Sequence, residues 1–146
     1  VGRKLLRDGG ATVSAFISDM RAVDAPLANA GEHLATVRHA LARGLDELVQ
    51  SSTVLLTGER RDPELVSAAA FDYMMLIGTV IGGWQLARGA LVALEQIAAG
   101  GDRAFLQTQV VMAQFYAEHV LPRCSAHAAA VRAGSGSTMA LAADHF

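Results

Sequence analysis

The side chains best suited to chemistry in this chain are His119, Cys124 and His127, which lie close together in its last third. Imidazole and thiolate groups bind zinc or iron, and a thiol beside an imidazole can act as a nucleophile. Offsets of five and three residues point the three side chains to different faces of a helix, unless a kink at Pro122 realigns them. We therefore interpret them as a core-edge histidine, a buried thiol and a surface histidine, and predict no metal site.

Other catalytic patterns are missing. None of the six glutamates or eight aspartates is followed three residues later by histidine, as a di-iron bundle requires. The chain also lacks His-Glu-x-x-His and the glycine-rich phosphate-binding motifs. Asp72 and Glu95 lie in the most apolar segment, where burial can make a carboxylate a base. For Asp72, pairing with an arginine or a position at a helix edge is the simpler explanation. Ser135 fits a linker residue, and Ser137 fits the cap of a last helical turn. We predict no catalytic and no cofactor-binding residue.

The composition is that of a helical domain. Of 146 residues, 52% are hydrophobic, 18% charged and only 5% aromatic, with 28 alanines and 17 leucines. This excludes a disordered chain, and it disfavours a β domain, which would be richer in β-branched and aromatic residues. The single Cys124 excludes a disulfide scaffold. With a net charge of −2 and scattered basic residues, nucleic-acid binding has little support.

Apolar periodicity and breaker residues predict an all-α, up-and-down bundle of three long helices plus a shorter one. The predicted helices span residues 11–23, 31–57, 62–98 and 103–133, with a short final turn from 137 to 143. Pro26 and the segment 29–31 should separate the first two, and Pro122 should kink the last one. Asp62 and Asp102 are predicted N-caps. The helix 31–57 has one apolar stripe, comprising Leu34, Val37, Leu41, Leu45, Leu48, Ser52, Leu55 and Leu56.

The helix 62–98 is apolar on nearly all sides between Ala68 and Leu94, so we expect it in the middle of the bundle. Its longest uncharged stretch has 15 residues, fewer than the roughly 20 that span a bilayer, and we predict no membrane span. Gly78 and Gly82 should mark a close approach by another helix. On the helix 103–133, helical spacing also relates Phe105, Thr108, Met112, Phe115 and His119.

Two runs resemble the C-terminal domain of long-form acyl-CoA dehydrogenases, which are bacterial flavoenzymes. The first run is Gly82-Gly83-Trp84-Gln85-Leu86-Ala87-Arg88, and the second is Phe115-Tyr116-Ala117-Glu118-His119-Val120-Leu121-Pro122. The second is preceded by Asp102-x-x-Phe105-Leu106, and the ending Gly134-x-x-Ser137-x-Met139-Ala140-Leu141 also fits. The resemblance covers essentially the whole chain. Asp72-Tyr73-Met74-Met75 departs from the family, which more often has a Tyr-Leu pair there.

The resemblance implies an activity for a longer parent protein and none for this chain alone. In such enzymes a glutamate removes the α-proton of the acyl thioester, and FAD accepts the β-hydride, giving the 2-enoyl-CoA. Val1 is not methionine, and residues 1–10 resemble the end of the last catalytic-domain helix, so the glutamate and most of the flavin site should lie upstream. The resemblance thus implies FAD in the parent, none in this fragment, and the bundle domain over residues 11–146.

We expect the motif residues to have a structural role, with direct contact to substrate or flavin as the alternative. We expect Trp84 and Tyr116 to pack between adjacent helices and Arg88 to pair with Glu118. The implied partners are the catalytic domain of the same polypeptide, further copies in a homo-oligomer, and acyl-CoA bound by the parent, in the cytoplasm. Two alternatives stay open, a stand-alone helical interaction or scaffolding module and a metal-dependent bundle enzyme. The upstream sequence would separate the first alternative from the leading interpretation, and elemental analysis would test the second.

Overall fold

The computed structural model describes residues 1–141, except for the side chains of residues 2–4. Every regular element in this part of the chain is helical, which confirms the predicted all-α class. The elements are α1 (Gly2–Arg7), α2 (Ala11–Arg21), α3 (Asp24–Asn29), the 3₁₀ turn η1 (Gly31–Leu34), α4 (Ala35–Gly58), α5 (Leu65–Ala68), α6 (Ala70–Ala98), α7 (Arg103–His119), the 3₁₀ turn η2 (Leu121–Arg123) and α8 (Cys124–Ala133).

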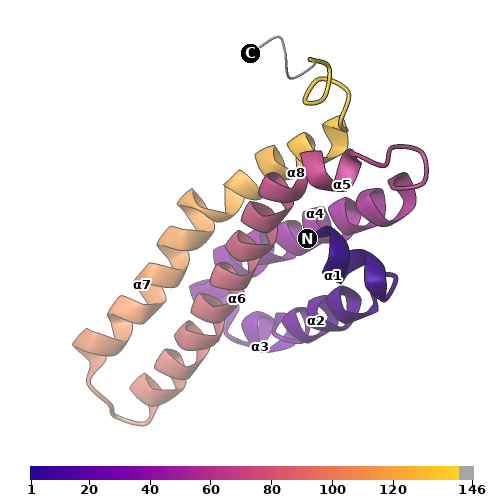
Figure 1. Cartoon of the computed structure of the whole chain (residues 1–146). Helices are drawn as coiled ribbons and strands as arrows, with labels where there is room; N and C mark the ends of the chain where they lie inside the picture. Colours follow the sequence, from indigo (N-terminus) through magenta and orange to yellow (C-terminus); the bar gives the residue numbers. More distant parts are fainter. Residues whose placement is uncertain (142–146) are drawn as a thin grey trace.

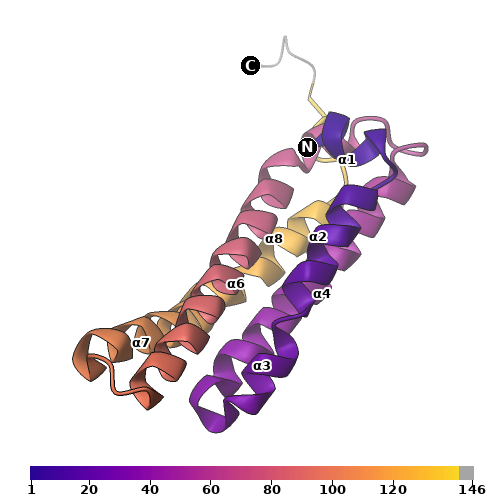
Figure 2. The same ribbon diagram turned by 90° about the horizontal axis from the view of Figure 1, so that it is seen from below.

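The long helices form the predicted up-and-down bundle (Figure 1). Helices α6 and α7 run antiparallel side by side and share the most extensive interface, while α4 contacts both of them and α8. Viewed after a quarter turn, α2 and α3 lie along α4 (Figure 2). The three long helices of the prediction are therefore α4, α6 and the α7–α8 pair, and the shorter one is α2.

The apolar stripe predicted for the second helix is the centre of the core. Seven of its eight side chains are buried, and Leu56 is half-buried. The polar member, Ser52, donates its hydroxyl to the Leu48 carbonyl at 2.7 Å and shares a 2.8 Å hydrogen bond with the buried Tyr73 hydroxyl. Since the Ser52 proton is already used, Tyr73 is the donor to Ser52. This bond links α4 to α6 inside the core.

The connection between α2 and α4 corrects the predicted break at Pro26. Pro26 lies within α3 as its third residue. This position is tolerated because the first N–H groups of a helix have no intrahelical partner, so proline loses no hydrogen bond there. The chain turns instead at Gly31, whose φ of 64° favours glycine, and a 3₁₀ turn precedes α4.

Asp102 caps α7 as predicted, because its carboxylate accepts hydrogen bonds from the N–H groups of Ala104 at 3.0 Å and Phe105 at 3.3 Å. Asp62 accepts from the Glu64 N–H at 3.2 Å, but the regular helix begins only at Leu65 and is interrupted at Ala69 before α6. The predicted continuous helix 62–98 is therefore two helices. The final turn runs over residues 136–139, and the expected continuation to 143 extends outside the described residues.

The expectation that the most apolar helix is enclosed by the others is wrong. Only one side of α6 is buried, whereas Phe71, Met74 and Val92 are 69%, 60% and 50% exposed. By length and mean hydropathy α6 is the one helix in the described part of the chain that could cross a membrane. A single helix of this kind is weak evidence, because core helices of soluble bundles have the same composition.

On α7, the large apolar residues that lie at helical spacing face outward. Phe105, Met112 and Phe115 are 64%, 47% and 58% exposed. The buried positions are Leu106, Val110, Ala113 and Ala117. Two alanines on the inner side let α7 lie close to its neighbours, which the bulkier stripe would prevent. The predicted disruption at Pro122 is confirmed, since the helix ends at His119 and restarts as α8 after a 3₁₀ turn.

Candidate functional site

The two sequence motifs meet at the interface between α6 and α7. The Tyr116 hydroxyl donates a hydrogen bond to the Thr79 carbonyl at 3.0 Å, and a Cβ at Gly82 would collide with that hydroxyl. Burial raises the pKa of the Tyr116 phenol, so it remains a protonated donor at neutral pH. Gly82 is therefore the position that admits the tyrosine ring between the helices.

The second contact of the motifs joins Gly83 to Leu121. A Cβ added to Gly83 would lie 2.9 Å from Leu121 Cδ2 and 3.0 Å from Cδ1, so a side chain here would displace the leucine. Leu121 is buried because the helix breaks at Pro122 and the 3₁₀ turn directs the leucine inward. The Gly-Gly pair and the Tyr…Leu-Pro run are complementary halves of one packing site. The close approach predicted for Gly78 is wrong, since nothing lies within 4 Å of a Cβ there.

Trp84 and Arg88 lie on a different side of α6, toward α2. The Phe16 ring meets Trp84 edge-on, with ring centroids 5.7 Å apart and an interplanar angle of 90°. The Arg88 guanidinium stacks over Trp84 at 4.9 Å and donates to the Gln85 side chain at 3.1 Å. The expected pair between Arg88 and Glu118 does not form within the described part of the chain. Helix rotation explains the error, because Arg88 faces α2 while α7 packs on another side.

Phe115, Glu118 and His119 of the second motif face outward. Phe115 packs on His119 with ring centroids 4.7 Å apart, and both side chains are exposed. Glu118 lies 3.9 Å from the His119 imidazole, and both of these side chains are more than half exposed. An exposed pair of this kind contributes little stability. These residues therefore have no role inside the bundle.

The candidate ligands for a metal are separated. His119 is exposed on α7 and Cys124 is buried. His127 donates a 2.8 Å hydrogen bond from Nδ1–H to the Asp72 carboxylate. Among the described residues, no group of three or more histidine, cysteine or acidic side chains could hold a metal ion. Burial raises the pKa of the Cys124 thiol to about 11, so its nucleophilic thiolate is scarce at neutral pH. Asp72 pairs with a histidine and not with an arginine.

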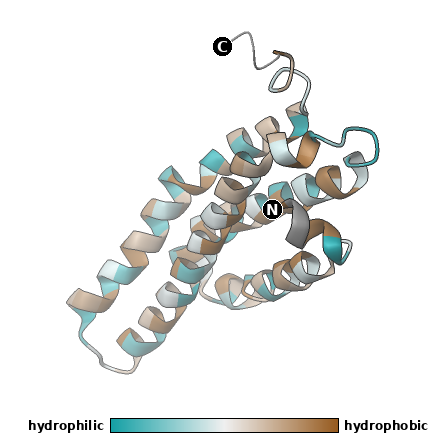
Figure 3. Ribbon diagram, in the orientation of Figure 1, coloured by the Kyte–Doolittle hydropathy of each residue, from teal (hydrophilic) through white to brown (hydrophobic). Residues whose placement is uncertain are grey.

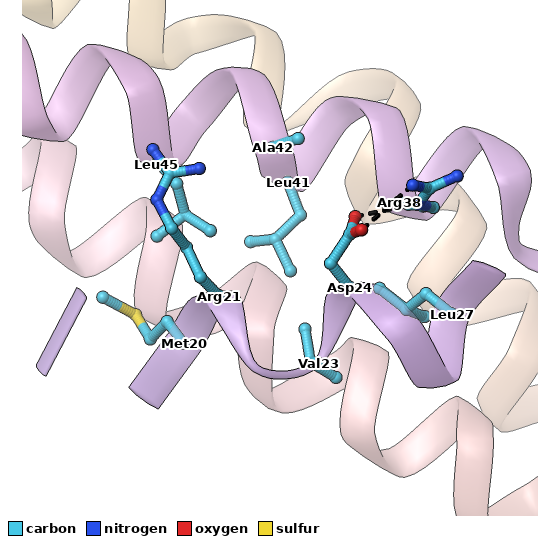
Figure 4. A pocket seen from close by; sticks show the side chains of 9 residues that line it. All are labelled: Met20, Arg21, Val23, Asp24, Leu27, Arg38, Leu41, Ala42 and Leu45. Carbon is cyan, nitrogen blue, oxygen red and sulfur yellow. Dashed lines mark hydrogen bonds and ion pairs between the residues drawn. The ribbon is translucent and has the colours of Figure 1, made fainter. Parts of the chain in front are cut away.

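A small hollow lies between the N-terminal helices and α4 (Figure 4). Its volume is about 240 Å³, and its apolar floor comprises Met20, Val23, Leu27, Leu41 and Leu45. Two arginines at its rim are already engaged. Arg21 pairs with Asp46 at 2.6 Å, and Arg38 binds Asp24 through two hydrogen bonds of 2.8 and 2.9 Å. The hollow is smaller than the usual 300–1,000 Å³ of a ligand site, and its cations are neutralised.

Local sequence patterns do not predict two polar contacts that the structure shows. Arg38 holds the pKa of the Asp24 carboxyl below its usual value, from a distance of 14 residues along the chain. Asp62 accepts from both the Oγ–H of Ser135 at 2.7 Å and the Ser135 N–H at 3.2 Å, which lowers its pKa and fastens the segment after α8 to the α4–α5 loop. Helical periodicity relates only residues within a few turns, so it finds neither pair.

The fold and this packing site define an all-α bundle domain. Residues 10–142 match the family described as "Acetyl-CoA dehydrogenase C-terminal like". Because the match covers most of the chain, the protein belongs to this family of acyl-CoA dehydrogenase C-terminal domains, and the resemblance found in the sequence is confirmed.

Two relatives make the relationship more specific. The chain is 37% identical over 133 residues to "3-methylmercaptopropionyl-CoA dehydrogenase" of Ruegeria pomeroyi, covering 86% of this chain and 21% of the relative. It is 33% identical to "Broad-specificity linear acyl-CoA dehydrogenase FadE5" of Mycobacterium tuberculosis, covering 82% of this chain and again 21% of the relative. The chain thus spans about one fifth of the length of these curated relatives.

Proposed function

We propose that this chain is the C-terminal auxiliary domain of an FAD-dependent acyl-CoA dehydrogenase, and that it acts by packing on the rest of the enzyme. One observation carries the proposal. Residues of the two motifs contact each other between helices, Gly82 with Tyr116 and Gly83 with Leu121. The parent would oxidise acyl-CoA thioesters to 2-enoyl-CoA in the cytoplasm, as a homo-oligomer. The acid–base and flavin chemistry would belong to the preceding catalytic domain.

The hollow between the N-terminal helices and α4 does not fit a flavin dinucleotide. The hollow in Figure 4 is about 240 Å³, and its two guanidinium groups are already bound to carboxylates. A pyrophosphate would have to displace Asp46 or Asp24 to reach them. We therefore assign no catalytic step to this chain and propose that FAD is held upstream.

The boundary between the two domains is part of the proposal. Residues 1–10 would be the end of the last catalytic-domain helix, and the bundle domain would start at residue 11. The family match begins at residue 10, and Gly9 and Gly10 separate α1 from α2 with φ values of 61° and 83°, which favours this boundary. Leu5 is nevertheless buried in the same core, so α1 should stay docked on the bundle.

The test compares the full-length product of the reading frame with this 146-residue chain. We expect the full-length protein to be yellow and to reduce a dye acceptor when acyl-CoA is added. The chain alone should fold, remain colourless and show no such activity. Stoichiometric flavin bound to the chain alone would refute the absence of a flavin site. A full-length protein that is inactive on short-, medium- and long-chain acyl-CoA substrates would refute the dehydrogenase function.

A further inference from the structure

The large exposed apolar side chains of the described residues concentrate on two adjacent helices. Four lie on α6 and four on α7, against one on α4 and two in the C-terminal tail. The α6–α7 outer face is defined by Phe71, Met74, Met75, Val92, Phe105, Val111, Met112 and Phe115. In Figure 3, brown residues recur along α6 from one end to the other. Large exposed apolar side chains gathered on two neighbouring helices are typical of an interaction site.

Helical spacing places the α6 residues on one side. Phe71, Met74, Gly78, Gly89 and Val92 follow one another at three, four, eleven and three residues, opposite the buried side of the helix. Nothing lies within 4 Å of a Cβ at Gly78 or Gly89, so this side is open.

The exposed side of α7 continues the same surface. Met112 and Phe115 flank the inward-pointing Tyr116, whose hydroxyl lies against Gly82. Gly82 is positioned along α6 between Gly78 and Gly89, so the outer sides of the two antiparallel helices are neighbours.

The face is uncharged over most of its length. Helix α6 has no charged residue from Tyr73 to Ala87, and α7 has none from Ala104 to Ala117. An uncharged apolar surface has no attraction for nucleic acid and fits an apolar protein surface. Two glycines at open positions on α6 would let such a partner approach the backbone closely.

The position of the N-terminus identifies the partner. Relatives extend over nearly five times the length matched here, so most of such a polypeptide lies outside this chain. In both views, Val1 lies beside the N-terminal end of α6 (Figures 1 and 2). A preceding segment would therefore arrive at the end of the bundle where α6 begins, which is the end of that helix that carries Phe71 and Met74. We propose that the α6–α7 outer face is the docking surface for the catalytic part of the same polypeptide; this rests on the proposed function.

The five methionines of the chain allow a direct test by oxidation with hydrogen peroxide. Met74, Met75 and Met112 lie on the face, while Met20 is fully buried in the core and serves as the internal reference. In this chain alone the three should oxidise readily. In the full-length protein they should react at least about tenfold more slowly, since oxidation follows exposure. Equal rates in both proteins would overturn the proposed docking surface.

A pair of variants of the full-length protein gives a second readout. Phe115→Glu puts a charge into the face, whereas Val49→Glu makes the same change at an exposed apolar position of α4. Only Phe115→Glu should restore rapid oxidation of Met112. Restoration by Val49→Glu as well would contradict the assignment to this face.

The outcomes separate the docking surface from the function. A full-length protein that oxidises acyl-CoA but leaves Met74, Met75 and Met112 fully reactive keeps the proposed function and refutes the docking surface. Protection that appears in the isolated chain, rises with its concentration and equals that of the full-length protein would assign the face to a second copy and refute the proposal. A reading frame that starts at residue 1 would refute both.

Discussion

Some glycines of α6 are needed for packing between helices, and others face solvent. Gly82 and Gly83 are required by Tyr116 and Leu121, whereas Gly78 and Gly89 face open space. The spacing Gly78-x-x-x-Gly82 suggested the wrong pair, because periodicity cannot tell which of several glycines meets a neighbour. The adjacent Gly-Gly pair proved to be the part of the motif that packing requires.

This division predicts opposite effects of the same substitution. Gly78→Ala should raise the free energy of unfolding of this chain by about 1 kcal/mol, because alanine favours a helix and has room. Gly83→Ala should lower it by about 1–3 kcal/mol, because its Cβ would press on Leu121. Urea unfolding followed by circular dichroism measures both changes. Stabilisation by Gly83→Ala would contradict the packing described here.

At the scale of elements, the buried side of α7 is its less bulky side. Both its inner and outer positions carry apolar residues at helical spacing, so the pattern alone favours the side with phenylalanines. The inner alanines, Ala113 and Ala117, allow a short distance between helices, which determines the choice. The same ambiguity affects α6, whose high hydropathy predicts burial on all sides although only one side is buried.

Asp72 and His127 link α6 to α8, and their coupling is testable. Their side chains are 29% and 20% exposed and share a 2.8 Å bond. A double-mutant cycle with Asp72→Ala and His127→Ala should give a coupling energy of about 0.5–1.5 kcal/mol at neutral pH.

The exposed pair Arg21 and Asp46 provides the control cycle. Its side chains are 45% and 58% exposed, so screening by water should limit their coupling to a few tenths of a kcal/mol. Thermal unfolding of the four single and two double variants supplies the data. A coupling for Asp72 and His127 no larger than that of the control would show that their bond does not help to hold α8 on α6.

At the scale of the whole molecule, the bundle has a well-packed interior and one apolar exterior face. The interior is continuous from α1 to α8 and includes a hydrogen bond between Ser52 and Tyr73. The exterior face belongs to the two helices that also carry the family motifs. The motifs thus hold α6 and α7 against each other, and the outer sides of these two helices carry the exposed apolar residues.

The isolated chain should therefore bind the dye anilinonaphthalene sulfonate while folded, because the dye reports exposed apolar surface. Phe105→Gln combined with Phe115→Gln should remove most of the fluorescence, with little change in thermal stability since both side chains are exposed. Val49→Gln, at an exposed position of α4, should leave the signal nearly unchanged. Equal losses in both variants would mean that the dye does not distinguish this face.

The sequence by itself determined the class of fold, the long helices, the cap at Asp102, the break at Pro122 and the family. These features depend on local preferences and on short motifs, which are fully present in the chain. Only the tertiary structure decided that Arg88 turns toward Trp84, that Tyr116 reaches the Thr79 carbonyl, and that the bulkier sides of α6 and α7 face outward. The physical reason is that two apolar sides of a helix look alike in sequence, and the shape of the neighbouring helix selects which one is buried.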